Sequence, residues 1–117
     1  MKALITGGAG FIGFHLANHL ISKGFRVDIA DNFQRGKKDK DFNALLKQKN
    51  LKLITLDVTA QNQFSKLGKD YDHVYHFAAI NGTGNFYRIP DQVLKVGALG
   101  TINVLEWFSR HPPCPPC

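Results

Sequence analysis

The sequence has no long hydrophobic run, and it has almost no cysteine or proline before its last seven residues. Of two cysteines and five prolines in 117 residues, only Pro90 lies outside the segment 111–117. No apolar run approaches the roughly 20 residues that a membrane-spanning helix needs. The N-terminal residues run directly into glycines and show no signal-peptide pattern. We therefore expect no membrane partner and, by default, a cytoplasmic location.

The two cysteines, Cys114 and Cys117, have the C-x-x-C spacing of redox and zinc sites. A redox pair needs a helix N-terminus that lowers a thiol pKa, and a zinc site needs two further ligands. The sequence offers neither near this proline-rich segment, which cannot continue a helix. We interpret residues 111–117 as a disordered tail without a metal site.

Acidic residues are also scarce, because 15 Lys and Arg face 9 Asp and Glu, for a net charge of +6. Most of the surplus lies between Arg35 and Lys52. A basic patch there could attract the phosphates of a nucleotide or of a nucleic acid. However, no aromatic residue interleaves with the lysines before Phe42, so a nucleic-acid platform is poorly supported. We favour a solvated helix face and expect no nucleic-acid partner.

Strand-like and helix-like segments alternate along the chain. Short apolar runs predict strands, and apolar residues that recur every three or four positions predict helices. Such alternation favours right-handed crossovers and a parallel sheet with helices on both faces. We predict an α/β fold with one domain over residues 1–110, a three-layer αβα arrangement around a partial, Rossmann-like doubly wound sheet of strand order 3-2-1-4. The expected strands are 2–6, 26–30, 51–56 and 73–77; the expected helices are 11–23, 39–48, 61–67 and 91–110; and a glycine-bearing loop is expected over 80–90.

Three glycines at a spacing of three, Gly7, Gly10 and Gly13, stand between the first strand and the first helix. In a dinucleotide-binding turn, the first permits a tight exit from the strand and the second lets the backbone approach a pyrophosphate. The third lets the helix pack close to the sheet. Unpaired amides near Phe11 and Ile12 would face the phosphates at the positive end of the helix dipole. The alternative, a flexible glycine loop, does not explain the flanking strand and helix.

Asp31 ends the second expected strand, 21 positions after Gly10. A carboxylate at this place accepts hydrogen bonds from both ribose hydroxyls of an adenosine. It would repel a 2′-phosphate, which favours NAD over NADP, although Arg35 and Lys37 are close enough in sequence to weaken that preference. The alternative is a turn residue before Asn32.

Two further strand ends carry candidate cofactor contacts. Asp57 could reach an adenine amino group, with Val58 beside the ring, although a helix cap or turn explains this Asp equally well. The fourth strand leads into His76–Ala79, where small residues leave room for a ribose and a nicotinamide. No second ligand stands at metal spacing from His76, so we interpret it as a structural histidine and expect no metal.

Together these segments resemble the extended short-chain dehydrogenase/reductase family, and more narrowly its NAD-dependent sugar-nucleotide epimerases, dehydratases and decarboxylases. The resemblance rests on Thr6–Gly13, Asp31–Phe33, Asp57–Val58, His76–Ala79 and Gly100–Glu106. It implies an NAD cofactor and a nucleotide-sugar substrate for the full-length enzyme. The cofactor contacts that it implies are Gly7, Gly10, Phe11, Ile12 and Gly13 for the pyrophosphate, Asp31, Asn32 and Phe33 for the adenosine ribose and its surroundings, Asp57 and Val58 for the adenine, and Phe77, Ala78 and Ala79 for the centre of the site.

The resemblance also implies a reaction, in which a Tyr with a Lys-lowered pKa deprotonates a sugar hydroxyl while NAD⁺ takes the hydride. Neither Tyr71, Tyr75 nor Tyr87 has the Lys four positions later that the family's Tyr-x-x-x-Lys requires, and Gly97 replaces a family Asn. We therefore expect no catalytic residue here and an N-terminal enzyme fragment that is inactive alone. A non-catalytic dinucleotide-binding module and a truncated reading frame are the alternatives.

The last expected helix, 91–110, carries Leu94, Ala98, Ile102 and Leu105 on one face. The corresponding helix of the family commonly joins a dimer, so the resemblance implies a homodimer through this helix. Without a fifth strand the fourth strand is an exposed edge, for which we expect aggregation or unusual pairing. Residues Thr83, Asn85 and Arg88 of the expected loop could touch a substrate.

Overall fold

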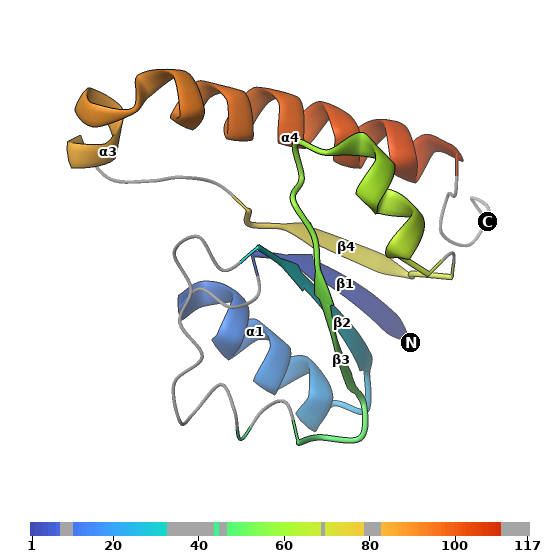
Figure 1. Ribbon diagram of the computed structural model, residues 1–117. Coiled ribbons are helices and arrows are strands. Elements are labelled where there is room, and N and C mark those ends of the chain that lie inside the picture. The colour runs from blue at the N-terminus through green and yellow to red at the C-terminus, as the bar shows by residue number, and fades with distance from the viewer. Residues whose placement is uncertain (8–10, 33–43, 45–46, 69, 79–82, 111–117) are drawn as a thin grey trace.

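The computed structural model describes residues 1–7, 11–32, 44, 47–68, 70–78 and 83–110. They form a four-stranded parallel sheet of order β3-β2-β1-β4, which confirms the predicted fold class and strand order (Figure 1). The strands are β1 (Lys2–Thr6), β2 (Arg26–Asp31), β3 (Leu51–Thr55) and β4 (His73–His76). The helices are α1 (Phe11–Ser22), α3 (Thr83–Arg88), α4 (Pro90–Arg110) and a 3-10 helix, η1 (Gln61–Lys66).

Successive side chains of a strand point to opposite faces of the sheet, so each face carries its own apolar cluster, which helices cover. In β1, Ala3 and Ile5 are fully buried in a cluster with Ala17 of α1. Leu4 points the other way, into a second cluster with Phe64 of η1 and Val104 of α4. Figure 1 shows α1 on one side of the sheet and η1 and α4 on the other. The predicted three-layer αβα arrangement is thereby confirmed.

The first helix ends as the sequence predicts, at a glycine. Gly24 has a φ of 87° and no atom within 4 Å of a Cβ built on it. Its backbone N–H donates to the Ile21 carbonyl, and the N–H of Phe25 donates to the Leu20 carbonyl, both at 3.0 Å. A left-handed residue after the last turn satisfies helix carbonyls in this way, and glycine adopts that conformation without steric cost.

The expected loop over 80–90 is wrong in part, because Thr83–Arg88 forms the helix α3. Two glycines in this segment suggested a loop, but α3 packs against α4, and tertiary contact overrides weak helix propensity. Helix α4 then begins at Pro90, where the missing N–H costs nothing because first-turn amides have no partner within the helix. The expected helix over 39–48 falls largely outside the described residues, as does the tail 111–117. The domain boundary at residue 110 stays a prediction.

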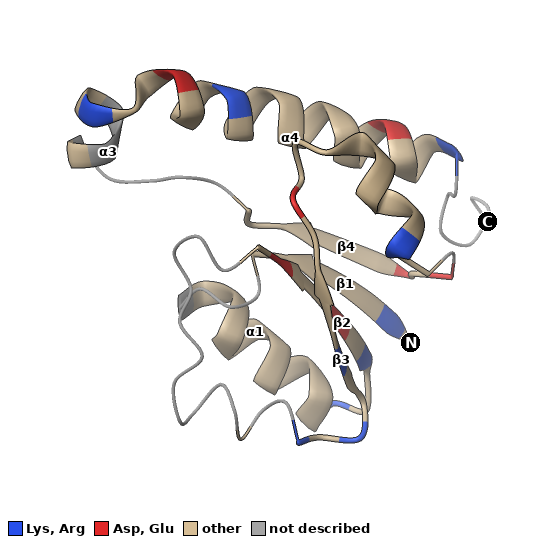
Figure 2. Ribbon diagram, in the orientation of Figure 1, with Lys and Arg blue, Asp and Glu red and all other residues tan. Residues whose placement is uncertain are grey.

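Charge is distributed along α4 with both signs, as Figure 2 shows. Asp91 and Glu106 alternate with Lys95 and Arg110 along its 21 residues. Within the described ranges, no helix is both long and apolar enough to cross a membrane.

Candidate functional site

Strand register brings the carboxyl ends of β1, β2 and β4 level with one another. Thr6 of β1 pairs with Ala30 of β2 on one side and with His76 of β4 on the other. The residues that follow, Gly7, Asp31 and Phe77, therefore lie at the same edge of the sheet, with Asp31 still paired to Thr55 of β3. After β1 the chain crosses to one side for β2 and β3 and to the other side for β4, so this edge is a topological switch point. Ligands of doubly wound sheets bind at such an edge.

Gly7 is a glycine for two independent reasons. Its φ of 73° lies in the left-handed region, and a Cβ there would stand 2.8 Å from the carbonyl carbon of Phe77 and from the backbone nitrogen of Ala78. These are main-chain atoms, which cannot rotate away as a side chain would. The N–H of Gly7 donates to the Ala30 carbonyl at 2.8 Å, and the N–H of Phe77 donates to the Thr6 carbonyl at 2.9 Å. The backbones leaving β1 and β4 thus cross in contact; we call this contact the Gly7–Ala78 crossing.

The start of α1 is described only in part. Phe11 begins the helix, the side chain of Ile12 is 66% exposed, and Gly13 is buried. Gly10, the residue expected nearest the pyrophosphate, lies outside the described residues. The burial of Gly13 fits its expected place between helix and sheet, and the phosphate contacts stay a prediction.

Asp31 is the last residue of β2 and is only 8% exposed. It is a strand residue, not a turn residue, and its carbonyl accepts a hydrogen bond of 3.2 Å from the N–H of Leu56. Its neighbour Asn32 is exposed, and Phe33 lies outside the described part of the chain. Asp31 therefore stands where a ribose-binding carboxylate is expected, one strand over from Gly7, although its role stays a prediction.

Asp57 and Val58 have structural roles of their own. The Oδ1 atom of Asp57 accepts hydrogen bonds from the N–H and the hydroxyl of Thr59, at 2.9 and 2.8 Å, which is the turn geometry considered as the alternative. Val58 is 5% exposed, and its carbonyl accepts a hydrogen bond of 2.8 Å from the buried amide of Asn103 in α4. A Cβ on Gly100 would stand 2.6 Å from Val58, which explains glycine there.

His76 has two hydroxyl partners, as expected of a structural histidine. Its Nδ1 lies 2.6 Å from Oγ1 of Thr6 and its Nε2 lies 3.2 Å from Oγ1 of Thr101. Burial lowers the pKa of the imidazole below its usual value. The next residue, Phe77, is 41% exposed, and Ala79 lies outside the described residues. Among the described residues no three His, Cys, Asp or Glu side chains gather as metal ligands would.

The substrate contacts expected of three residues after β4 stay a prediction. Thr83, Asn85 and Arg88 belong to α3, and the side chain of Arg88 is exposed.

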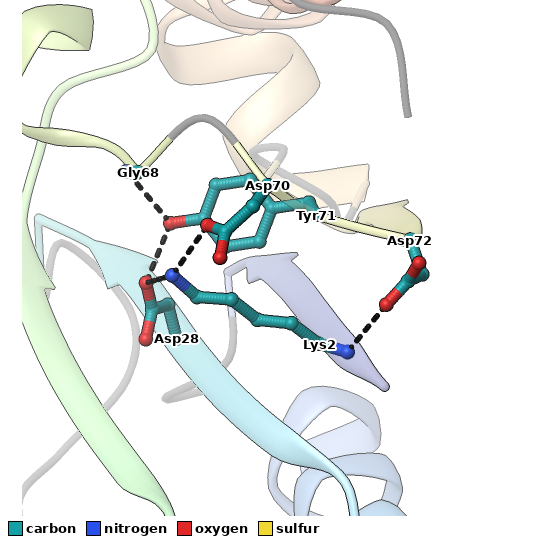
Figure 3. Close-up of polar contacts among 6 residues, drawn as sticks. All are labelled: Lys2, Asp28, Gly68, Asp70, Tyr71 and Asp72. Carbon is teal, nitrogen blue, oxygen red and sulfur yellow. Dashed lines mark hydrogen bonds and ion pairs between the residues drawn. The ribbon is translucent and has the colours of Figure 1, made fainter. Parts of the chain in front are cut away.

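The sequence analysis missed a cluster of polar side chains at the opposite, amino end of the sheet (Figure 3). The hydroxyl of Tyr71 donates to Oδ2 of Asp28 at 2.6 Å and accepts from the N–H of Gly68 at 3.1 Å. Tyr71 and Asp28 are 2% and 6% exposed. Burial, followed by the bond to Asp28, raises the pKa of Tyr71. A signal was present, since Asp28 interrupts an apolar strand and a buried carboxylate needs a partner.

Lys2 completes this cluster from the start of β1. Its Nζ lies 2.9 Å from Oδ1 of Asp70, 3.8 Å from Oδ2 of Asp28 and 4.9 Å from the centre of the Tyr71 ring. Its backbone N–H donates to Oδ2 of Asp72 at 2.8 Å. The pKa of Asp70 is lowered by its hydrogen bond and charge interaction with Lys2. We call Lys2, Asp28, Asp70, Tyr71 and Asp72 the amino-end cluster.

The chain is similar in sequence and in fold to proteins whose names describe enzymes of nucleotide-sugar metabolism. The model of the family described as GDP-mannose 4,6 dehydratase matches residues 4–114. A UDP-N-acetyl-alpha-D-glucosaminuronate decarboxylase of Bacillus cytotoxicus is 37% identical over 105 residues, which are 90% of this chain and 32% of that protein. A UDP-glucuronic acid decarboxylase 1 of Danio rerio is 36% identical over 109 residues, 93% of this chain and 25% of that protein.

A solved structure of Thermus thermophilus UDP-glucose 4-epimerase in complex with NAD superposes with a TM-score of 0.80 at 29% identity. The match covers 95% of this chain and 34% of that one. The chain thus spans between a quarter and about a third of the length of these similar proteins.

Proposed function

The chain belongs to the GDP-mannose 4,6 dehydratase family, and from that membership we propose that the carboxyl end of its sheet binds NAD on behalf of a nucleotide-sugar-modifying enzyme. This membership agrees with the resemblance drawn from the sequence. We infer a nucleotide-sugar substrate for the whole enzyme, and the names of the two decarboxylases and of the epimerase described above, which refer to UDP-sugars, support this inference. The cytoplasmic location stays a prediction.

The Gly7–Ala78 crossing is the observation that carries the proposal. Because Gly7 has no side chain and follows β1 directly, the backbone there can turn sharply toward the start of α1. The amides at a helix N-terminus have no partner within the helix and favour a diphosphate. Asp31, level with Gly7 in the neighbouring strand, supports ribose recognition and a preference for NAD over NADP. Gly10, Phe11, Ile12 and Gly13 belong to the same proposed phosphate site.

Calorimetric titration of the 117-residue chain with NAD and NADP tests this proposal. We expect NAD to bind more tightly than NADP, and Asp31→Asn to weaken NAD binding about tenfold or more, since a hydrogen bond to a charged group contributes about 1.5–3 kcal/mol. Asp70→Asn is the matched control, because it removes the same charge from the exposed side chain at the other end of the sheet. If NAD does not bind, or if both variants weaken it equally, the proposal fails.

We propose further that these 117 residues do not catalyse the family's reaction alone. No tyrosine among them belongs to a Tyr-x-x-x-Lys pair, and the pKa of Tyr71 is raised instead of lowered. Incubation with NAD and UDP-glucose or UDP-glucuronate should give no NADH and no altered sugar. Turnover would contradict this proposal. NAD binding without turnover also fits a non-catalytic binding module. Addition of the remaining two thirds of a relative distinguishes an enzyme fragment from such a module, because only the fragment would regain activity.

The outer face of α4 supports a homodimer. Leu94, Ile102 and Leu105 are 71%, 51% and 62% exposed, although they share one helix face. Large exposed apolar patches mark association surfaces. We expect a dimer by sedimentation equilibrium, and we expect Leu105→Glu with Ile102→Glu to give a monomer. If the wild-type chain is still a monomer at a concentration of about 0.1 mM, the proposed homodimer is contradicted.

A further inference from the structure

Four hydrogen bonds link the carboxyl ends of β1 and β4 to the middle of α4. The N–H of Ala78 donates to Oγ1 of Thr6 at 3.2 Å, and that oxygen lies 2.6 Å from Nδ1 of His76. On the other side of the imidazole, Nε2 lies 3.2 Å from Oγ1 of Thr101, whose hydroxyl donates to the Gly97 carbonyl at 2.5 Å. His76 is the only titratable group in this set of five residues.

The donors and acceptors in this set fix the protonation of His76. The single hydroxyl proton of Thr101 is used on Gly97, so Thr101 can only accept from the imidazole, and Nε2 must carry a hydrogen. In the neutral ring Nδ1 is then an acceptor, and it receives the hydroxyl proton of Thr6. The oxygen of Thr6 remains free to accept the N–H of Ala78. While His76 is neutral, each hydrogen-bond donor in the set has an acceptor. This holds only for the neutral ring.

A second proton, on Nδ1, would break this arrangement. Nδ1 would become a donor, and the hydroxyl of Thr6 would have to rotate its own hydrogen away from the ring. That hydroxyl holds the N–H of Ala78, the nitrogen that lies 2.8 Å from the position of a Cβ on Gly7. The change therefore reaches the Gly7–Ala78 crossing directly.

We propose that neutral His76, protonated on Nε2, is a positioning residue that holds the Gly7–Ala78 crossing in shape, and that its protonation loosens the crossing and weakens dinucleotide binding. The structural half of this proposal concerns the crossing alone. The ligand half rests on the proposed function.

In the described part of the chain, no charged side chain takes part in the hydrogen bonds around His76. Burial is the one cause that shifts its pKa, and the direction is downward. Lys2 and Asp72 are bonded at the amino end of the sheet, Asp57 is bonded to Thr59, and Glu106 accepts from Gln61. The described titratable side chains on the neighbouring strand, on β4 itself and on α4 are Lys2 of β1, His73 and Tyr75 of β4, and Asp91, Lys95, Glu106 and Arg110 of α4. Asp72 lies just before β4, and Asp57 lies two residues after β3.

The sign of the pH effect follows. A histidine whose pKa is lower in the folded protein than in the unfolded chain, where it is about 6.5, contributes its stability above that value. The contribution is lost as the pH falls through the lowered folded pKa. Affinity for the dinucleotide falls with the fraction of chains in which His76 is neutral. A fall from pH 7.5 to pH 5 should weaken NAD binding roughly threefold to tenfold.

NMR titration of the full 117-residue chain tests the structural half without a ligand. Nitrogen shifts of His76 should show the Nε2–H form at pH 7.5 and a pKa below 6.5. The amide signals of Gly7 and Ala78 should move with the same midpoint. A ring protonated on Nδ1 at pH 7.5, or amides of Gly7 and Ala78 that do not follow the imidazole, would overturn the proposal.

His76→Asn is the decisive variant, because its side-chain oxygen can accept from Thr6 but does not titrate between pH 5 and 8. It should bind NAD within about threefold of wild type at pH 7.5, with an affinity that no longer changes with pH. His73→Asn, two residues earlier and exposed, is the matched control and should keep the wild-type pH dependence. If His76→Asn keeps that dependence, the proposal is overturned. If NAD does not bind wild type at any pH, the proposed function fails, while the amide titration still decides the role of His76.

Discussion

The two ends of the sheet are held together by different chemistry. At the amino end, the ammonium of Lys2 and the carboxylates of Asp28 and Asp70 satisfy one another around the Tyr71 hydroxyl (Figure 3). At the carboxyl end, the recorded contacts around the Gly7–Ala78 crossing join neutral groups, such as the hydroxyl of Thr6 and the imidazole of His76.

This difference separates structure from binding. Charges that pair with one another inside a fold stabilise only while both partners are present, and they leave little to offer a ligand. Neutral hydrogen bonds and a backbone without side chains let an anionic ligand, such as a diphosphate, approach the main-chain amides closely. The comparison predicts that changes at the amino end lower stability and spare NAD affinity, whereas changes at the carboxyl end lower affinity.

Gly7→Ala should have the largest effect. The new Cβ would stand 2.8 Å from main-chain atoms at a φ of 73°, so the backbone must move. We expect a loss of about 3 kcal/mol or more in the free energy of unfolding, measured in urea, and NAD binding too weak to detect. Gly24→Ala has a similar φ but open space around the Cβ, and it should cost only about 1 kcal/mol. Equal losses in the two variants would show that the crossing imposes no special constraint.

Lys2→Met should have the next largest effect, and on stability alone. Removal of the ammonium leaves the carboxylate of Asp28 buried beside a single hydroxyl, at a cost of about 2 kcal/mol. The affinity for NAD should stay within about twofold of wild type, because the two ends of the sheet are distant and their effects should be independent. The control is Lys95→Met on the exposed part of α4, which should change stability by less than about 0.5 kcal/mol. A large loss of NAD affinity in Lys2→Met would mean that the two ends are coupled.

Alkaline pH should weaken the amino end specifically. The pKa of Tyr71 is raised in the folded protein, so its contribution is present below pH 10 and is lost as the pH rises above that value. Absorbance at 295 nm, the band of the tyrosinate ion, should show Tyr71 ionising only as the chain unfolds. In Tyr71→Phe the remaining tyrosines should ionise without that coupled step. Early ionisation of all tyrosines in folded wild type would contradict the buried hydroxyl.

Acid should have the smallest effect. Lys2 lowers the pKa of Asp70, so this carboxylate stabilises the fold above its ordinary pKa of 3.8, and the contribution is lost as the pH falls through the lowered value. Because Asp70 is exposed, solvent screens the interaction. Asp70→Asn should flatten the decline of the thermal midpoint between pH 5 and 3 only slightly. A steep change would show that Asp70 matters more than its exposure implies.

The sequence was sufficient to predict those features of the fold that depend on neighbouring residues in the chain. The periodicity of apolar residues predicted the strands and the faces of the sheet, and Gly24 predicted the end of α1. The glycine spacing and Asp31 pointed to the carboxyl edge of the sheet, where the proposed dinucleotide site lies, because parallel strands bring their carboxyl ends together.

Features that depend on distant contacts were not predictable in the same way. The amino-end cluster joins residues up to 70 positions apart, and α3 owes its form to packing on α4. A helix-cap or turn role for Asp57 was left open beside an adenine contact, and its partner in the turn, Thr59, is identified only by the structure. The second reason for a glycine at position 7 lies in the backbone of Phe77, which no local pattern reveals.

Amide NMR mapping of NAD on the 117-residue chain tests the central claim most directly. We predict shift changes at Gly7, Ile12, Gly13, Asp31 and Ala78, with the amides of Lys2, Asp70 and Tyr71 unchanged. Changes centred on the amino-end cluster, or no saturable changes at all, would contradict the account.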